Sequence, residues 1–424
     1  MRPDFLYAGH ARFLGTPVAE TIIVIGAGMV GAACALRLQS AGFQVALVDP
    51  GPPERAASFG NAGHIAVEQV EPLASWSTIR SAPSMLFAFG GPLDFRLADA
   101  PYWGPWAMRF LAASGRHRFE AGASALGALM GRGVEAWADL LAEVGQPELI
   151  RTDGHAVLWF DEREAEAGRR AWGRTRTGPA TIQPLSDADV AAYRAAMPGR
   201  PPVAGLAFGG TARLSSPQTV RAALVSAFER RGGEVVQAEV TRLSADGTMQ
   251  IGATSRMADR VVVCAGVRSR GLMEGLGVTA PLVAERGYSI LVPAPHWAAG
   301  LRTAVVEGQS IVLAPHDEGL RATSYVEFAA PDSPPDPRKW ARLERRVRAL
   351  GFDVPAGVQR WIGCRPTLPD YLPAIGALDG GRILYAFGHQ HLGVTLSAVT
   401  AEVIAGLADG QPTDRRFDIR RFRQ

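Results

Sequence analysis

The chain has 424 residues, of which 47% are hydrophobic and 20% are charged, and its formal net charge is +3. These values are typical of a globular protein with two or more lobes, and so small a charge does not favour a nucleic-acid partner. The arginine-rich end at 415–423 is interpreted as a solvated tail. The three cysteines lie far apart and form no spacing for zinc binding or redox exchange, so we expect a reducing compartment and no metal site.

Localisation follows from the apolar pattern. Residues 1–20 lack the long apolar block of a secretory signal, and no window approaches the length of a membrane-spanning helix. We therefore expect a cytoplasmic protein without an integral membrane span. Peripheral contact with the inner face of a membrane stays open.

The first motif is an apolar run, 22–25, followed by a glycine-rich turn, an Ala/Leu-rich stretch and a second apolar run. The first run has no polar alternation, which predicts a parallel strand covered on both faces. Gly26 permits a tight turn, Gly28 lets backbone N–H groups approach a pyrophosphate, and Gly31 allows the following helix to pack closely on the strand. Asp49 ends the second run, eighteen positions after Gly31, where a carboxylate accepts hydrogen bonds from ribose hydroxyls. The pattern predicts a dinucleotide site; a βαβ unit with glycines for packing alone would not require Asp49.

The middle of the chain is predicted to form a second lobe before later segments rejoin the cofactor-binding fold. Small residues are dense at 58–65, which implies that the backbone there passes close to another group. A helical pattern around 125–144 and strand-like segments predict a second lobe; the strand-like segments are 154–160, 205–208 and 287–292. Ser216 and Pro217 predict a helix that runs to about residue 231, and strands expected at 234–243, 249–254 and 260–265 re-enter the cofactor fold.

The predicted domains are therefore discontinuous. We assign 20–70, 212–270 and 355–424 to a Rossmann-like cofactor-binding domain, and 71–211 and 271–354 to a substrate-binding domain. The fold class is α/β, with an α+β substrate lobe built on a mixed β-sheet.

Candidate catalytic and binding residues are concentrated near the carboxyl end of the chain. A Gly-Cys-Arg-Pro turn at 363–366 precedes a strand at 382–387 and a Gly/His-rich loop at 388–395. The helix that follows, to about residue 408, is apolar on nearly every side and is expected to be buried. Its amino end follows the glycine-rich loop, so its positive dipole end favours an anionic partner.

These blocks resemble the FAD-dependent D-amino-acid oxidase/dehydrogenase superfamily, and within it the D-amino-acid dehydrogenase (small-subunit) type. The resemblance covers nearly the whole chain after residue 20. It implies bound FAD, held without a covalent link because the usual linking positions carry no cysteine. The residues that it implies for the FAD site are Gly26, Gly28, Met29, Val30, Gly31, Asp49, Pro50, Ser58, Asn61, Ala62, Gly63, His64, Val240, Ala265, Gly266, Gly388, His389, Gly393, Val394 and Thr395.

The resemblance also implies a substrate end. Arg365 would hold a substrate carboxylate by two parallel hydrogen bonds, with a structural ion pair as the alternative. Tyr288 would supply a second carboxylate contact, or else is a tyrosine at the edge of the core. His64, Arg365 and His389 are assigned to catalysis and His391 to substrate binding, although a histidine satisfied by backbone bonding is the usual case.

The implied reaction is oxidation of a D-amino acid by hydride transfer from Cα to flavin N5, giving an imine or a 2-oxo acid. A cyclic substrate such as D-proline or D-hydroxyproline is favoured by the histidine-rich loops. The alternatives are oxidation of sarcosine, glycine or an opine, and a non-catalytic FAD-binding subunit of a larger complex. An NAD-dependent dehydrogenase would use the first motif alone, and the carboxy-terminal block argues against it. The electron acceptor, whether quinone, oxygen or a partner protein, stays open.

Overall fold

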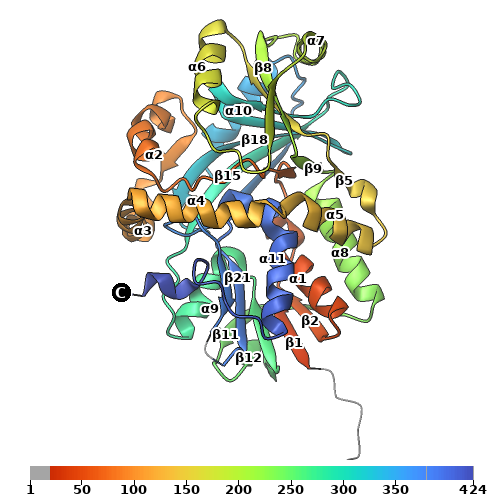
Figure 1. Cartoon of the computed structure of the whole chain (residues 1–424), viewed down its shortest axis with the longest axis vertical. Coiled ribbons are helices and arrows are strands. Elements are labelled where there is room, and N and C mark those ends of the chain that lie inside the picture. The colour runs from red at the N-terminus through yellow and green to blue at the C-terminus, as the bar shows by residue number, and fades with distance from the viewer. Residues whose placement is uncertain (1–19, 379, 424) are drawn as a thin grey trace, which may run out of the picture.

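Two large β-sheets, one in each lobe, organise the computed structural model, which describes residues 20–378 and 380–423 (Figure 1). The lower lobe in Figure 1 holds a six-stranded sheet and the upper lobe holds a nine-stranded sheet. Helix α4, Arg116–Met130, runs across the molecule where the two lobes meet. The α/β class and the mixed sheet of the second lobe are confirmed.

The cofactor lobe is built on a doubly covered, mostly parallel sheet. Its strand order is β10-β2-β1-β14-β21-β20, in which only β20 runs antiparallel to its neighbour. The strands are β1 (Thr21–Ile25), β2 (Gln44–Asp49), β10 (Glu234–Gln237), β14 (Arg260–Val263), β20 (Ala374–Ala377) and β21 (Ile383–Phe387).

Both faces of this sheet are buried, which explains the unbroken apolar run of β1. Ile22 and Val24 pack with helices α1 (Met29–Ser40), α8 (Pro217–Arg230) and α11 (Gly393–Ala408). Ile23 and Ile25 point to the other face. There they pack with a small antiparallel sheet and with helix α9; these elements are β11 (Val240–Leu243), β12 (Thr248–Ile251), β13 (Thr254–Met257) and α9 (Ser269–Gly275).

The substrate lobe is built on a mixed sheet with the order β19-β15-β18-β17-β16-β6-β8-β7, and β4 pairs with β18. Its strands are β4 (Leu93–Phe95), β6 (His155–Trp159), β7 (Thr181–Pro184), β8 (Ala204–Gly209), β15 (Val283–Val292), β16 (Thr303–Val306), β17 (Ile311–His316), β18 (Gly319–Ala329) and β19 (Gln359–Thr367). Helices α6 (Glu162–Trp172), α7 (Asp187–Ala196) and α10 (Pro337–Ala349) belong to this lobe (Figure 1).

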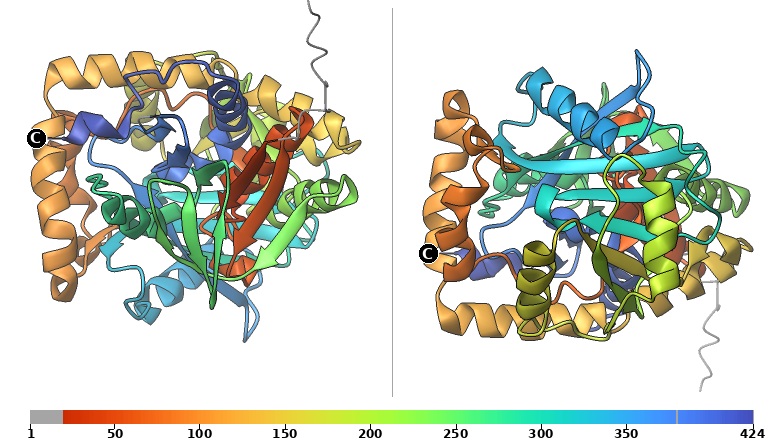
Figure 2. Two further views of the ribbon diagram at one scale, coloured as in Figure 1. Left: turned by 90° about the horizontal axis from the view of Figure 1, so that it is seen from below. Right: turned by 90° about the horizontal axis from the view of Figure 1, so that it is seen from above.

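A third, three-stranded sheet and a run of helices connect the lobes. The small sheet has the order β3-β9-β5, with β3 at His64–Ile65, β5 at Ile150–Arg151 and β9 at Ala212–Leu214. The connecting helices are α2 (Trp76–Ser81), α3 (Ala100–Ala113), α4 and α5 (Gly133–Glu143). Figure 2 shows α3 and α4 along two adjacent edges of the molecule, both from above and from below.

Three element predictions need correction. The helical pattern around 125–144 is two helices, because the chain turns between Met130 and Gly133. The strand expected at 234–243 is two strands, β10 and β11, that enter different sheets. Strand β19 pairs with β15 of the substrate lobe along its whole length, although 355–424 was predicted to belong entirely to the cofactor domain.

The carboxy-terminal helix is the core of the cofactor lobe. By length and composition the stretch Gln390–Ala408 would pass as a membrane span, contrary to the prediction that no window approaches one. However, 67% of it is buried inside the protein, where it packs against α1 and α5, so we interpret it as a core helix.

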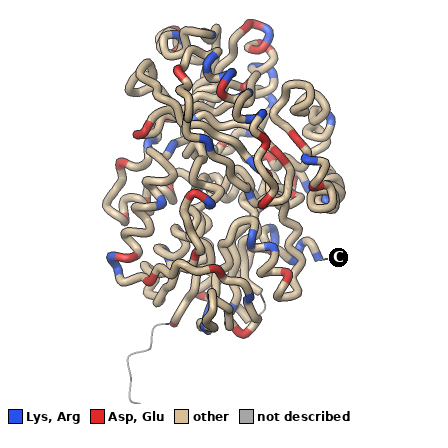
Figure 3. The backbone as a smooth tube through the Cα atoms, turned by 180° about the vertical axis from the view of Figure 1, so that it is seen from behind, with Lys and Arg blue, Asp and Glu red and all other residues tan. Residues whose placement is uncertain are grey.

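The arginine-rich end is not a solvated tail, because Ile419 is fully buried and Arg421 pairs with Asp370. Basic and acidic residues are scattered over both lobes (Figure 3).

Candidate active site

A cavity of about 600 Å³ lies between the lobes, at the carboxyl ends of β1, β2 and β14. Gly28 and Asp49 line it from one end of the chain, and Arg365, His389 and Gly393 line it from the other. The structure therefore brings the glycine motif and the carboxy-terminal loop to one pocket. Its size suits a small-molecule or cofactor site.

The glycine turn forms a cradle in which each glycine has a distinct packing role. Gly26 has φ +103°, and a Cβ there would lie 2.5 Å from the carbonyl oxygen of Cys264; a Cβ on Gly31 would lie 1.7 Å from the carbonyl oxygen of Gly26. A Cβ on Gly28 would meet only the Cβ of Ala56, at 3.9 Å, because this position faces the cavity. Gly26 and Gly31 are thus required by packing, whereas Gly28 keeps the cavity open.

The amino end of α1 offers free donors at this cradle. No side chain caps the helix and its first turn holds no acidic residue, and Met29 and Val30 line the cavity. First-turn N–H groups have no partner within a helix, so they and the helix dipole favour a bound anion. The cradle therefore fits the pyrophosphate of a dinucleotide.

Asp49 is held rigidly beside the cradle. One of its carboxylate oxygens accepts a hydrogen bond from the Ala27 N–H at 2.7 Å, and the other accepts one from the Gly51 N–H at 2.7 Å. Each carboxylate oxygen has a second lone pair, so both can still accept from ribose hydroxyls.

Arg221 of α8 is a pocket residue that sequence reasoning missed. Its Nε donates to the carbonyl oxygen of Ala27, and the side chain lines the cavity beside the glycine turn. The neighbouring residues Val220 and Leu224 are buried. An arginine between two buried apolar positions of α8 is the sequence signal that could have identified Arg221 as a pocket residue. A guanidinium here adds positive charge at the position where a phosphate group would bind.

Some of the remaining predicted FAD residues line the cavity and others do not. Pro50, Ser58, Asn61, Val240, Ala265, Gly266 and Val394 line the cavity. Gly31, Ala62, Gly63, His64, Gly388 and Thr395 are not among the residues that line the cavity, and their contact with FAD stays a prediction. Gly63 and Thr395 have a clear structural role: the Gly63 N–H donates to Asn61 Oδ1 at 2.8 Å, and Thr395 Oγ1 accepts from the Ala66 N–H at 3.0 Å.

Arg365 of β19 is oriented by a buried carboxylate. Its Nη1 lies 3.1 Å from Oε1 of Glu285, which is 1% exposed, and donates to the carbonyl oxygen of Tyr325 at 3.2 Å. Glu285 Oε2 also accepts from Thr367 Oγ1 at 3.2 Å and from the Tyr371 hydroxyl at 3.1 Å. Burial, and then Glu285, raise the pKa of Tyr371, so this hydroxyl stays protonated as a donor.

The other edge of the same guanidinium is available. Among the described residues, Nε and Nη2 of Arg365 have no hydrogen-bond partner, and Arg365 lines the cavity. A Cβ on Gly287 would lie 2.3 Å from Nη2, so the absence of a side chain there makes room for the guanidinium. The ion pair and the carboxylate site predicted as alternatives are compatible, because they use different edges of one planar group.

Two histidines line the cavity in neutral form. His389 Nε2 lies 3.0 Å from Thr400 Oγ1, and burial lowers the pKa of His389 to about 3. His391 Nε2 lies 2.6 Å from Gln69 Oε1, and burial lowers the pKa of His391 to about 4. Because the amide oxygen only accepts, His391 donates from Nε2 and its Nδ1 is left as an acceptor.

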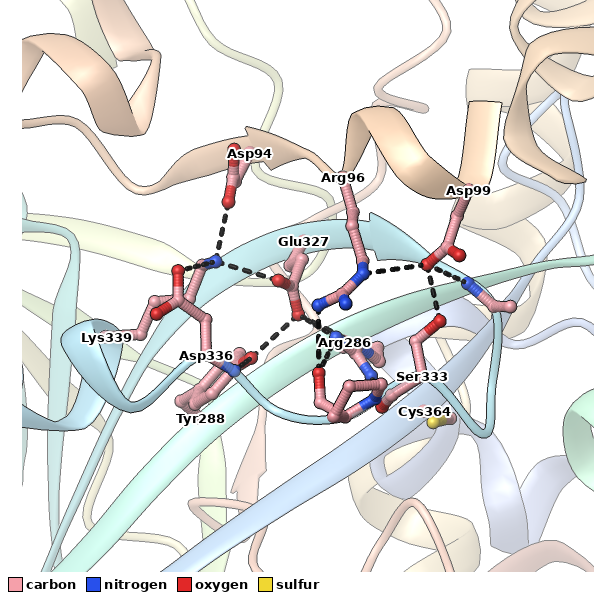
Figure 4. Close-up of polar contacts among 12 residues, drawn as sticks. Asp94, Arg96, Asp99, Arg286, Tyr288, Glu327, Ser333, Asp336, Lys339 and Cys364 are labelled. Carbon is pink, nitrogen blue, oxygen red and sulfur yellow. Dashed lines mark hydrogen bonds and ion pairs between the residues drawn. The ribbon is translucent and has the colours of Figure 1, made fainter. Parts of the chain in front are cut away.

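The structure does not bring Tyr288 to the cavity. Its side chain is 1% exposed, its hydroxyl donates to Glu327 Oε2 at 2.8 Å, and it accepts from the Asp336 N–H at 3.0 Å (Figure 4). The predicted second carboxylate contact is therefore wrong, because both positions on the hydroxyl are already used inside the substrate lobe. The alternative of a core tyrosine holds.

Tyr288 belongs to a buried ionic network that holds the segment 330–336 (Figure 4). Arg286 pairs with Glu327, which also pairs with Lys339, and Arg286 donates to the carbonyl oxygens of Ser333 and Pro334. The segment places Pro331 and Asp332 in the cavity lining, and Asp332 pairs there with Arg268 of the cofactor lobe. No sequence signal connects these two residues, which are 64 positions apart.

Comparisons with known proteins agree with this geometry. The model of the family described as "DAO: FAD dependent oxidoreductase" matches residues 21–407. A D-amino-acid oxidase from Bradyrhizobium diazoefficiens is 32% identical over 93% of this chain and 96% of its own, and a D-amino acid dehydrogenase from Paramagnetospirillum magneticum is 29% identical over 94% and 97%. The crystal structure of glycine oxidase from Geobacillus kaustophilus superposes with a TM-score of 0.69 at 18% identity, covering 95% of this chain and 98% of that one.

The family match covers most of the chain, and the cradle, the uncapped helix end and the cavity fit its cofactor. The chain belongs to the DAO family of FAD-dependent oxidoreductases.

Proposed function

We propose that this protein oxidises a D-amino acid at Cα. The observation that carries the proposal is that the open edge of Arg365 and the dinucleotide cradle at Gly28 line one cavity. The curated relatives named D-amino-acid oxidase and D-amino acid dehydrogenase support an amino acid as the substrate class. When bound, FAD supplies the acceptor of the hydride at its N5.

Arg365 binds the substrate carboxylate through Nε and Nη2, because its Nη1 is occupied by Glu285. This edge-on pair fixes the orientation of the amino acid, which is the main contribution that the protein makes to a hydride transfer. The Cα–H bond breaks with its electron pair, the nitrogen lone pair forms the C=N bond, and water then releases a 2-oxo acid and ammonia unless the amine is part of a ring.

The neutral histidines suit a substrate whose amine is unprotonated. Since burial lowers the pKa of His391 to about 4, its ring carries no charge at neutral pH and its free Nδ1 accepts a hydrogen bond from the amine. The histidine-rich loops are the reason that we carry forward cyclic substrates, D-proline and D-hydroxyproline, as the preferred ones; the single N–H of their neutral ring nitrogen matches one acceptor.

We also propose that FAD is held without a covalent link. Cys364 lines the cavity, but burial raises the pKa of its thiol, and the Sγ–H donates to the carbonyl oxygen of Pro331 at 3.6 Å. A thiol with a raised pKa is a poor nucleophile. Denaturation and filtration should release all of the yellow cofactor, and flavin that stays with the polypeptide would contradict this.

An anaerobic screen tests the function. Purified holoenzyme is mixed with D-, L-, N-methyl and cyclic amino acids, and loss of the flavin absorbance is followed. We expect bleaching by D-amino acids, faster with D-proline than with D-alanine, and a pyrroline as the product from D-proline. Bleaching by sarcosine with release of formaldehyde would favour the secondary-amine alternative, and no bleaching by any amino acid would leave the non-catalytic FAD-binding subunit.

A further inference from the structure

A cluster of side chains of metal-ligating types, two of them buried and one half-buried, lies outside the cavity lining. We call His64, Glu68 and His155 the histidine–glutamate cluster; one ligand atom from each lies within 4.8 Å of the others. His64 is on β3, Glu68 is in the loop that follows it, and His155 begins β6 of the substrate lobe. The two histidines are 91 positions apart, so linear spacing could not predict this cluster.

Glu68 is a carboxylate without a compensating charge. It is 3% exposed, its Oε2 has no hydrogen-bond partner, and no Lys or Arg among residues 20–378 and 380–423 forms an ion pair with it. A buried carboxyl group is normally protonated, paired with a cation or bound to a metal ion, and burial raises the pKa of Glu68 to about 7. The position where a cation would neutralise Glu68 is the space between it and the two imidazoles.

His155 Nδ1 has more polar neighbours than one ring nitrogen can serve. It lies 3.2 Å from His64 Nε2 and 3.0 Å from Thr211 Oγ1, and a ring nitrogen has either one proton or one lone pair in its plane. Two nitrogens on one tetrahedral zinc ion, each about 2.0–2.1 Å from the metal, lie about 3.3 Å apart. The spacing of the two imidazoles is therefore the spacing of two ligands of one metal ion.

We propose that His64, Glu68 and His155 bind one Zn²⁺ ion, a site independent of the FAD cavity. Two imidazoles and one carboxylate are the nitrogen and oxygen donors that zinc accepts, and its filled d shell imposes no geometric preference of its own. A water beside the Thr211 hydroxyl completes the tetrahedron. The bound charge of +2 offsets the unpaired carboxylate of Glu68.

Such a site cross-links the two lobes next to the cofactor. Asn61, three positions before His64, lines the cavity, and Gln69, which follows Glu68, accepts a hydrogen bond from His391. The metal ion fixes the segment between these two residues to β6 of the substrate lobe. Its role is structural, because neither Glu68 nor His155 reaches the cavity.

Metal analysis of purified holoenzyme tests this assignment. Wild-type protein, grown with zinc and freed of loosely bound metal by gel filtration, should carry about one zinc ion per chain. Glu68→Gln, which keeps the shape and removes the charge, and His155→Asn should each carry at least tenfold less. The matched control is His316→Gln: His316 is also buried and contacts the same segment, with Nε2 3.1 Å from the carbonyl oxygen of Ala62, but lies outside the cluster. It should retain the zinc.

The wild-type protein alone also decides the question if the variants fail to fold. Anomalous diffraction across the zinc absorption edge should give one peak between the three side chains. Wild-type protein with no more zinc than Glu68→Gln, an absent peak, or stoichiometric iron or manganese in place of zinc would overturn the proposal. Because these measurements do not depend on turnover, their outcome is separate from that of the proposed oxidation.

Discussion

At the scale of single residues, the planar group of Arg365 does two things at once. One edge neutralises the buried carboxylate of Glu285, and the other faces the cavity. Sequence resemblance predicted the second role and left the first as an alternative. It could not predict that both hold, because Glu285 is 80 positions away and becomes a neighbour only through the pairing of β15 with β19.

Replacement of Arg365 by lysine separates these roles. Lysine keeps the positive charge beside Glu285 but loses the planar fork, so kcat/KM for the D-amino acid should fall about 10- to 100-fold while the fold survives. Steady-state kinetics and thermal melting measure the two effects. The matched control is Arg268→Lys at the cavity rim, whose ion pair with Asp332 is exposed and should matter by less than about threefold. Equal losses in the two variants would contradict a specific carboxylate contact at Arg365.

The neutral state of His391 leads to a prediction about pH. Because burial lowers the pKa of His391 to about 4, the ring does not titrate between pH 6 and 9, and the rate of flavin reduction should rise with pH as the substrate amine loses its proton. His391→Gln should lower the rate but leave the midpoint of the profile in place. A midpoint that moves by more than about one pH unit in this variant would mean that the histidine titrates instead.

At the scale of elements, local pattern was sufficient wherever neighbours in sequence are also neighbours in space. The turn from β1 through the glycines into α1 is such a case, since the burial of β1 on both faces and the close approach of Gly31 to the carbonyl oxygen of Gly26 follow from the motif itself. The pairing of β19 and the cavity position of segment 330–336 depend on distant strands and on the Arg286 network, and no local pattern contains them.

Two glycines of this turn should respond differently to the same substitution. Gly28→Ala adds a methyl group that points into the cavity and meets only the Cβ of Ala56, at an ordinary contact distance, so FAD affinity should fall at least about tenfold while FAD-free protein unfolds as before. Gly31→Ala drives a Cβ onto the carbonyl oxygen of Gly26, so unfolding should become easier by about 1–3 kcal/mol even without FAD. Flavin titration and urea unfolding of the stripped proteins measure both. A destabilised Gly28→Ala variant with normal FAD affinity would show that the cradle is a packing motif alone.

At the scale of the whole molecule, buried neutral histidines make the fold sensitive to acid. Burial lowers the pKa of His316 to about 4 and that of His389 to about 3, below the ordinary value of 6.5. Unfolded histidines take up protons near pH 6.5 while these folded ones do not, so the stability is fully present above that pH and is lost as the pH falls toward 4.

The size of this effect can be measured. Each such histidine adds a slope of up to about 1.4 kcal/mol per pH unit to the free energy of unfolding between pH 6.5 and 4. Urea unfolding of holoenzyme at pH 7, 6 and 5, at one FAD concentration, should show a steepening decline, and His316→Gln should make it shallower. A free energy of unfolding that is unchanged from pH 7 to pH 5 would contradict the neutral buried state.

The central claim is that both ends of the chain surround one flavin and that Arg365 presents the substrate to it. The most direct measurement is a crystal structure of the holoenzyme soaked with an unreactive carboxylate such as benzoate. We expect the adenosine end of FAD beside Asp49, the ring system beside His389, and the carboxylate on Nε and Nη2 of Arg365. A flavin ring on a surface remote from His389, or a carboxylate bound away from Arg365, would contradict the account.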